Sequence, residues 1–291
     1  MSGKAGPQAG SGKHGHALTE GVATAFSWLT IIPVRGATTF DRVTGRRAIA
    51  SIPVVGLVPG VAAAAVILLI SWLVSDSGEA AIAIGAFVAG ALAVVLGLAL
   101  TRAMHADGLA DVTDALGSYG PPEKARAVLA DASAGPVAVA AVGMTHLVQV
   151  AGYAMLAVGL SQKMLPDAPL SPLLLAATTA ILPAVLSRAA SMTACSTRWG
   201  PFSESGFGSL VAGTQPLWSI ALWWISLAGI SSVIAGWAGL AACAVAVGIA
   251  VWLGRLCNRR FGGINGDVLG TVVEFTTAAT AVLLGFALVL G

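Results

Sequence analysis

Three aspartates and a histidine lie close together in the stretch HADGLADVTDALG, residues 105–117. Asp107, Asp111 and Asp114 recur at spacings of four and three, so on a helix they would share a face about 60° wide. Carboxylates this close repel one another, and the stretch contains no lysine or arginine. A bound divalent cation would relieve the repulsion, and oxygen ligands favour magnesium, calcium or manganese. Because magnesium usually combines one or two carboxylates with substrate phosphates, we expect a phosphate-bearing substrate; the alternative is a solvated polar face.

A second group of polar residues lies in RRFGGINGDVLGTVVE, residues 259–274. A glycine-rich loop that runs into a helix N-terminus can cradle phosphate with its N–H groups, and Arg259 and Arg260 would neutralise that phosphate. Asp267 would share the metal ion. Glu274 follows on the same helical face, and a carboxylate so deep in an apolar run is by default a functional candidate. The alternative is an ordinary glycine-rich turn.

A third polar stretch, residues 186–213, contains two arginines. Arg188 lies near the end of an apolar run, and Arg198 lies in the segment that follows. Guanidinium groups bind phosphate in bidentate geometry, so each is a candidate phosphate clamp. Each would otherwise be a positive charge that sets membrane orientation, and Arg188 is the better functional candidate.

The composition indicates what kind of scaffold must position these residues. Hydrophobic residues make up 57% of the 291-residue chain and charged residues only 10%, against about 25% in soluble domains. We therefore predict an all-α polytopic integral membrane protein. Its net charge of +2 is too small to suggest a nucleic-acid partner. Three widely spaced cysteines without metal-ligand spacing are expected to be free thiols.

Runs of about 20 apolar residues are long enough to cross a bilayer. We expect about seven transmembrane helices, at 49–75, 80–104, 136–160, 171–194, 213–234, 237–256 and 271–290. Residues 17–34 are apolar but interrupted, which favours an extra interfacial or re-entrant N-terminal helix. Residues 1–16 lack the apolar core of a signal peptide and are expected to form a disordered tail. This leaves 17–291 as a single helical membrane domain.

Lysine and arginine are unequally divided between the two sides of this topology. With the N-terminus on side one, all of the 15 lysines and arginines except Lys163 fall on that side. Cytoplasmic loops carry such an excess, so we predict a cytoplasmic N-terminus and an external C-terminus. The polar stretches fall on the same side. We expect an active site on the cytoplasmic face of the cell (inner) membrane, built from loops 102–131, 188–208 and 255–274.

The stretch TRAMHADGLADVTDALG at 101–117 resembles the signature of the cobalamin synthase family, the adenosylcobinamide-GDP ribazoletransferases. The core of that signature is His, any residue, Asp-Gly-Leu-Ala-Asp, two residues and Asp, and this chain matches it throughout. GGINGDVLGTVVE at 262–274 is similar to the family's C-terminal block. Weaker blocks match LTIIPV at 29–34, PVVGLVPG at 53–60 and SRAASM at 187–192.

The segment after the acidic motif departs from the family pattern. The family usually carries a basic residue, Asp, Ser and Arg ahead of a glycine, whereas this chain reads ADASAG at 130–135. Asp131 remains, but Ala130 and Ser133 occupy the usual basic positions. If those basic residues bind phosphate in relatives, other cations such as Lys124 or Arg126 would have to replace them here. Otherwise the substrate preference or the activity of this chain would differ.

The resemblance implies a magnesium-dependent transferase. A hydroxyl of α-ribazole, or of its 5′-phosphate, attacks the cobinamide-side phosphorus of adenosylcobinamide-GDP; GMP leaves, and cobalamin or its 5′-phosphate forms in the last assembly step of the nucleotide loop. The expected partners are these substrates and the lipid bilayer, and a homo-oligomer remains open. We expect catalysis and Mg²⁺ binding from Asp107, Asp111, Asp114 and Asp267. We expect substrate binding from His105, Asp131, Arg188, Gly263, Asn265, Gly266 and Glu274, although a lone histidine such as His105 is more often structural.

Two other classes of protein remain as alternatives. Another intramembrane phosphotransferase or prenyltransferase would also pair spaced aspartates with magnesium. However, DGLADV has Asp111 where the CDP-alcohol phosphotransferase motif has arginine. An ion-coupled transporter would place ionisable groups near the bilayer midplane beside broken helices, whereas these carboxylates cluster toward one face.

Overall fold

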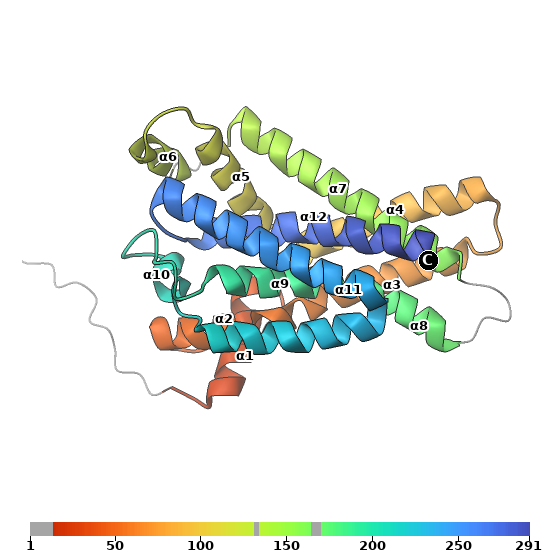
Figure 1. Ribbon diagram of the computed structural model, residues 1–291, viewed down its shortest axis with the longest axis horizontal. Helices are drawn as coiled ribbons and strands as arrows, with labels where there is room; N and C mark the ends of the chain where they lie inside the picture. Colours follow the sequence, from red (N-terminus) through yellow and green to blue (C-terminus); the bar gives the residue numbers. More distant parts are fainter. Residues whose placement is uncertain (1–13, 131–133, 164–169) are drawn as a thin grey trace, which may run out of the picture.

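The computed structural model describes residues 14–130, 134–163 and 170–291, and shows helices bundled roughly along one axis (Figure 1). Over these ranges the chain forms helices and two isolated β-bridges, with no strand, which confirms the predicted all-α class. Asp131, which we expected to bind substrate, lies outside the described residues.

Five helices of the described chain are long and apolar enough to cross a membrane. This agrees with a multi-pass membrane protein. The five are the joined pair α2 (Arg42–Val55) and α3 (Leu57–Leu73), then α4 (Glu79–Leu100), α7 (Pro136–Ser161), α11 (Leu217–Phe261) and α12 (Gly266–Leu290).

The long helix α11 consists of two arms that fold back on each other. Ala235 and Gly236 have non-helical backbone angles, and the φ of Gly236 is +56°, a left-handed value that favours glycine. Twelve residues of straight helix span about 18 Å, yet the Cys243 Sγ lies 3.7 Å from the Ser231 Oγ. The two arms correspond to the separate apolar runs predicted at 213–234 and 237–256.

The predicted run at 171–194 is also divided, into α8 (Leu170–Thr179) and α9 (Leu182–Ala194). Pro183 lies in the first turn of α9, where its missing N–H removes no helical hydrogen bond. Every residue of α9 is buried, and α9 contacts α2, α11 and α12. It therefore lies at the centre of the bundle and holds Arg188 there.

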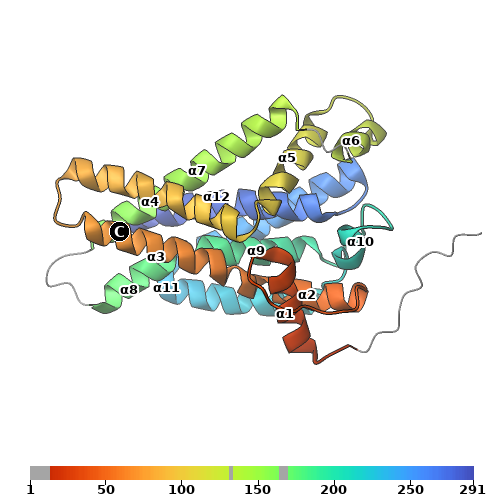
Figure 2. The ribbon, with the colours of Figure 1, turned by 180° about the vertical axis from the view of Figure 1, so that it is seen from behind.

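Short helices gather at one end of the bundle (Figures 1 and 2). They are α1 (Ala17–Leu29), α5 (Met104–Gly117), α6 (Pro122–Leu129) and α10 (Phe207–Val211). The extra N-terminal helix expected within 17–34 is thus present as α1.

The loops expected at this end are shorter than predicted. Most of 102–131 is helical in α5 and α6, and only residues 262–265 separate α11 from α12. The prediction counted polar segments as loops, but polar helices cover this end of the bundle. The three cysteines are free, as predicted, and all three are buried.

Candidate functional site

The acidic motif forms α5, which is set apart from α4 by a tight turn. Arg102 and Ala103 have φ values of 56° and 53°, in the left-handed region that costs a residue other than glycine about 1–3 kcal/mol. Arg102 offsets part of this cost because its Nη2 donates to the Trp28 carbonyl at 2.6 Å. The turn redirects the chain so that α5 crosses the start of α12.

Two glycines let the backbones of α5 and α12 touch. A Cβ on Gly108 would lie 2.7 Å from the Asp267 Cα, and one on Gly270 would lie 2.9 Å from the His105 carbonyl oxygen. The Thr271 hydroxyl also donates to the Gly108 carbonyl at 3.1 Å. This crossing brings the acidic face of α5 to the first turn of α12, where Asp267 lies.

The carboxylates at this crossing act on one another. Burial, followed by the negative charges of Asp267, Asp107 and Asp114, raises the pKa of Asp111 from 3.8 to about 6. None of these four aspartates forms an ion pair with a lysine, arginine or histidine of the described chain. The cluster therefore carries negative charge that the described residues leave without a cationic partner.

Two of the predicted site residues also cap helices. Asp114 accepts hydrogen bonds from the backbone N–H groups of Gly135 and Ala138, the latter at 2.8 Å, and so caps α7. Asn265 accepts from the Val268 N–H at 3.1 Å and so caps α12, while its amide donates to the Asp267 Oδ2 at 2.6 Å. Such caps contribute about 1 kcal/mol each. They fix the N-terminal ends of α7 and α12, and the acidic cluster lies beside these two ends.

The donor set fits a hard divalent cation, although the cage is incomplete. No three histidine, cysteine or carboxylate side chains in the described ranges are gathered so that they would hold a metal ion. Magnesium needs only one or two protein carboxylates when water and phosphate supply the other oxygens. Asp107, Asp111 and Asp267 are the residues that could hold it, because Asp114 binds the end of α7.

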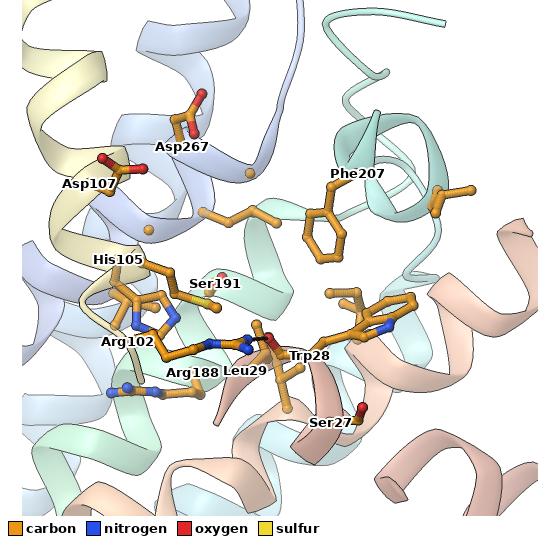
Figure 3. Close-up of a pocket in the computed structure, with 18 of the residues that line it drawn as sticks. Ser27, Trp28, Leu29, Arg102, His105, Asp107, Arg188, Ser191, Phe207 and Asp267 are labelled. Atoms are coloured by element: carbon orange, nitrogen blue, oxygen red, sulfur yellow. Dashed lines mark hydrogen bonds between the residues drawn. The ribbon is translucent and has the colours of Figure 1, made fainter. Parts of the chain in front are cut away.

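A cavity of about 690 Å³ opens beside this cluster (Figure 3). Asp107 and Asp267 line one edge, together with Gly266. The buried His105, Arg188 and Ser191 also line it. Trp28 and Phe207 lie across the cavity from the two aspartates (Figure 3), and Phe40, which lines the cavity too, stacks beside Trp28. The volume is that of a typical small-molecule site.

Arg188 and His105 bring polar atoms without partners to the cavity. They are only 6% and 8% exposed, and neither the Arg188 Nε nor the His105 Nδ1 has a hydrogen-bond partner in the described chain. Arg188 Nη1 donates to the Ser187 hydroxyl at 3.1 Å. Burial and the charge of Arg188 lower the pKa of His105 to about 3, so its imidazole is neutral. Buried polar atoms are normally satisfied, so these two mark a position for a polar ligand.

Glu274 lies below this cavity rather than in it. Seven residues of helix place it about 10 Å further along α12 than Asp267. It accepts from Gln149 Nε2 at 2.6 Å and lies 3.3 Å from His146 Nε2, both on α7. With Arg188 it lines a separate cavity of about 30 Å³, about the volume of one water molecule. The structure thus places Glu274 in a buried polar network with Gln149 and His146, and Arg188 is the residue that lines both cavities.

The glycine-rich turn is held against the segment that follows α9. A Cβ on Gly263 would lie 2.5 Å from the Pro201 carbonyl oxygen, and the Phe202 N–H donates to the Ile264 carbonyl at 3.0 Å. Gly263 is therefore required for close packing. A glycine at this position is thus explained by packing, whether or not its backbone N–H also binds phosphate.

Two of the arginines considered as phosphate ligands bind backbone carbonyls instead. Arg126 Nε donates to the Phe261 carbonyl at 2.7 Å. Arg260 donates to the carbonyls of Gly120 and Ser118 at 2.9 and 2.8 Å. Both hold the end of α11 in place, whereas Arg188 lines the cavity beside the acidic cluster.

Our reading of the sequence missed the aromatic wall and Ser191. Trp28 lies in the last turn of a short apolar helix, Phe40 precedes the cap of α2, and Phe207 lies within the GFG stretch at 206–208. Each has an ordinary local explanation, and no shared spacing relates them. Only packing brings them to one cavity.

The fold and the site define a polytopic helical membrane protein with an acidic cavity at one end of its bundle. The chain belongs to the cobalamin-5-phosphate synthase family, whose model matches residues 21–286, and this confirms the resemblance seen in the motifs. It is 39% identical to an adenosylcobinamide-GDP ribazoletransferase of Corynebacterium efficiens, over 97% of this chain and 96% of that protein. Proteins of the same name from Corynebacterium diphtheriae and Stutzerimonas stutzeri are 35% and 33% identical, over 97% and 92% of this chain and 97% of each relative. No solved structure matches the chain.

Proposed function

We propose that this protein is a magnesium-dependent adenosylcobinamide-GDP ribazoletransferase. It would join adenosylcobinamide-GDP to α-ribazole, or to its 5′-phosphate, and release GMP. Family membership and the names of the relatives support the reaction. The observation that carries the site is an acidic cluster without a cationic partner in the described chain, beside a cavity that contains the buried Arg188.

In this proposal one or two of Asp107, Asp111 and Asp267 would hold Mg²⁺, with water and phosphate oxygens as the other ligands. The bound ion would neutralise the substrate diphosphate. Arg188 donates to a phosphate oxygen, since a guanidinium in a buried setting forms strong charge-assisted hydrogen bonds. One carboxylate of the cluster accepts the proton of the attacking ribazole hydroxyl. A P–O bond to ribazole forms at the cobinamide-side phosphorus as the P–O bond to GMP breaks.

The reaction is tested with purified protein in detergent, adenosylcobinamide-GDP and α-ribazole. We expect GMP release and a product with the mass of cobalamin when Mg²⁺ is present, and neither in excess chelator. A parallel assay with α-ribazole 5′-phosphate identifies the preferred acceptor. Absence of product from either acceptor, in a preparation that is folded by its thermal midpoint, would contradict the proposal.

We also propose seven membrane crossings with the N-terminus and the site in the cytoplasm. Counting α2–α3, α4, α7, α8–α9, the two arms of α11 and α12 gives seven, and the unequal division of lysine and arginine supports this orientation. Because the native cysteines are buried, Ser205→Cys introduces an exposed thiol between α9 and α10. An impermeant thiol reagent should not label it in intact cells, whereas a tag after residue 291 should be accessible from outside.

A further inference from the structure

The cavity has an aromatic wall that the chemistry proposed above does not use. Trp28 comes from α1, Phe40 from the segment before α2, and Phe207 from α10. The ring centroids of Trp28 and Phe40 lie 6.3 Å apart with planes 17° from parallel, and Phe207 meets Trp28 edge-on at 5.3 Å. Trp28 and Phe207 lie across the cavity from Asp107 and Asp267 (Figure 3). Three separate segments thus converge on one wall.

Trp28 differs from the tryptophans whose role is evident from their packing. Trp223 and Trp224 donate their indole N–H groups to the Ala50 carbonyl and the Thr193 hydroxyl, each at 2.8 Å. Four other tryptophans are more than half exposed on the surface of the bundle, and Trp237 is one of them. Trp28 is half-buried, lines the cavity, and its N–H has no partner in the described chain. Trp28 therefore offers a ligand both a ring and an N–H donor.

The wall is held in a defined position relative to the acidic motif. Arg102, in the left-handed turn before α5, donates to the Trp28 carbonyl at 2.6 Å. Any ligand that contacts both walls is therefore positioned against Asp107. The cavity of about 690 Å³ has the size of a site for a drug-sized ligand, such as a nucleoside, and is too small to enclose a whole corrinoid.

We propose that Trp28, with Phe40 and Phe207, binds the planar base of a substrate nucleoside. The inference rests on the proposed function, which supplies two such bases: that of α-ribazole and the guanine of adenosylcobinamide-GDP. Aromatic side chains stack on any base through its π-face, and the Trp28 N–H would donate to a nitrogen or oxygen on the edge of the base. The sugar and phosphate would then extend toward Arg188 and the acidic edge.

The test measures binding separately from turnover. The dissociation constants of α-ribazole and of GDP, each with full-length protein in detergent, are compared for wild type, Trp28→Leu and Trp28→Phe. We expect Trp28→Leu to weaken one of the two ligands about tenfold, which corresponds to about 1.4 kcal/mol, and Trp28→Phe to restore most of the affinity. The ligand affected identifies the base that the wall binds. Trp237→Leu removes an equal ring from the outer surface and should change neither constant.

Two further measurements distinguish loss of base binding from loss of folding, and from failure of the proposed reaction. Phe207→Leu should weaken the same ligand as Trp28→Leu, and the thermal midpoints of both variants should stay near that of wild type. Unchanged binding of both ligands by Trp28→Leu would overturn the inference, and so would equal weakening that Trp28→Phe does not restore. If wild type binds the nucleoside but releases no GMP from adenosylcobinamide-GDP, the proposed function fails and the base site stands.

Discussion

The carboxylates on α12 lie in opposite settings only two helical turns apart. Asp267, at the first turn, faces the other acids of the cluster and has no cationic partner in the described chain. Glu274 is buried among polar groups and accepts from Gln149, beside His146. An acid whose partners are already present is explained by the fold. Acids that repel one another indicate a ligand that brings positive charge.

This difference assigns distinct roles to neighbouring residues. The cluster of Asp107, Asp111 and Asp267 should matter for metal and substrate, and little for the stability of the metal-free protein. The Glu274 network should matter for stability, because a buried charge or donor that loses its partner is costly. Arg188 lies between the two regions and lines both cavities.

The largest expected effect comes from Asp111→Asn, which keeps the shape of the side chain but removes its charge. GMP release should fall at least 100-fold, or about 2.7 kcal/mol in activation free energy. The metal-free thermal midpoint should hold or rise, because one of several repelling charges is gone. Turnover and thermal midpoint are measured with Mg²⁺ and with chelator, and Glu79→Gln, at the far end of the bundle, is the control. Full activity in Asp111→Asn would remove that residue from the metal site.

Glu274→Gln should act mainly on stability. The substitution removes the negative charge of Glu274, which interacts with His146 and with the buried Arg188. We expect the free energy of unfolding to fall by about 1–3 kcal/mol. The thermal midpoint should fall equally with and without Mg²⁺, whereas Glu123→Gln on the exposed face of α6 should leave it unchanged. A normal midpoint combined with lost turnover would instead place Glu274 among the substrate-binding residues.

Arg188→Ala tests the residue shared by both regions. We expect kcat/KM to fall at least tenfold, about 1.4 kcal/mol in transition-state stabilisation, because a phosphate oxygen loses its cationic donor. Arg188→Lys should restore little, since lysine lacks the planar fork. Lys163→Ala, on the opposite side of the predicted topology, should have no effect. Equal losses from Arg188→Ala and Lys163→Ala would contradict a role in phosphate binding.

The smallest expected effect is a pH dependence of stability to which Asp111 and Asp267 both contribute, since burial also raises the pKa of Asp267. The pKa of Asp111 is about 6 in the folded protein against the ordinary 3.8, so between these values the folded state binds more protons than the unfolded state. The thermal midpoint of metal-free protein should therefore fall as pH rises from about 4 through about 6. Mg²⁺ should restore stability above that range, where the carboxylate is ionised. The same slope in Asp111→Asn would show that another group causes it.

The acidic motif and the glycine-rich block were recognisable because their chemistry follows from spacing. Aspartates at 107, 111 and 114 share a helical face wherever that helix lies, and α5 confirms that these residues are helical. Spacing did not reveal that the Asp114 carboxylate caps α7 or that Asn265 caps α12. The Asp114 contact depends on where another helix begins, 21 residues further on. The Asn265 contact is local, because Val268 lies three residues after Asn265.

The sequence by itself determined the class of the protein. Apolar runs, scarce charges and a family signature depend on composition and local order, which require no knowledge of neighbours. Hydropathy alone also located both arms of α11, although the two arms are continuous with each other through the bend at Ala235 and Gly236.

Only the tertiary structure decided which of the candidate residues meet. Gly108 and Gly270 permit the close crossing of α5 and α12, and this crossing brings Asp267 to a motif about 160 residues earlier in the chain. Arg126 and Arg260 bind carbonyls while Arg188 stays buried beside the cavity, although all three are arginines in polar stretches of the sequence. Trp28, Phe40 and Phe207 form a wall only because α1 and α10 pack at the same end of the bundle. Such long-range packing depends on the shape of surfaces far apart in the chain, and no local pattern encodes it.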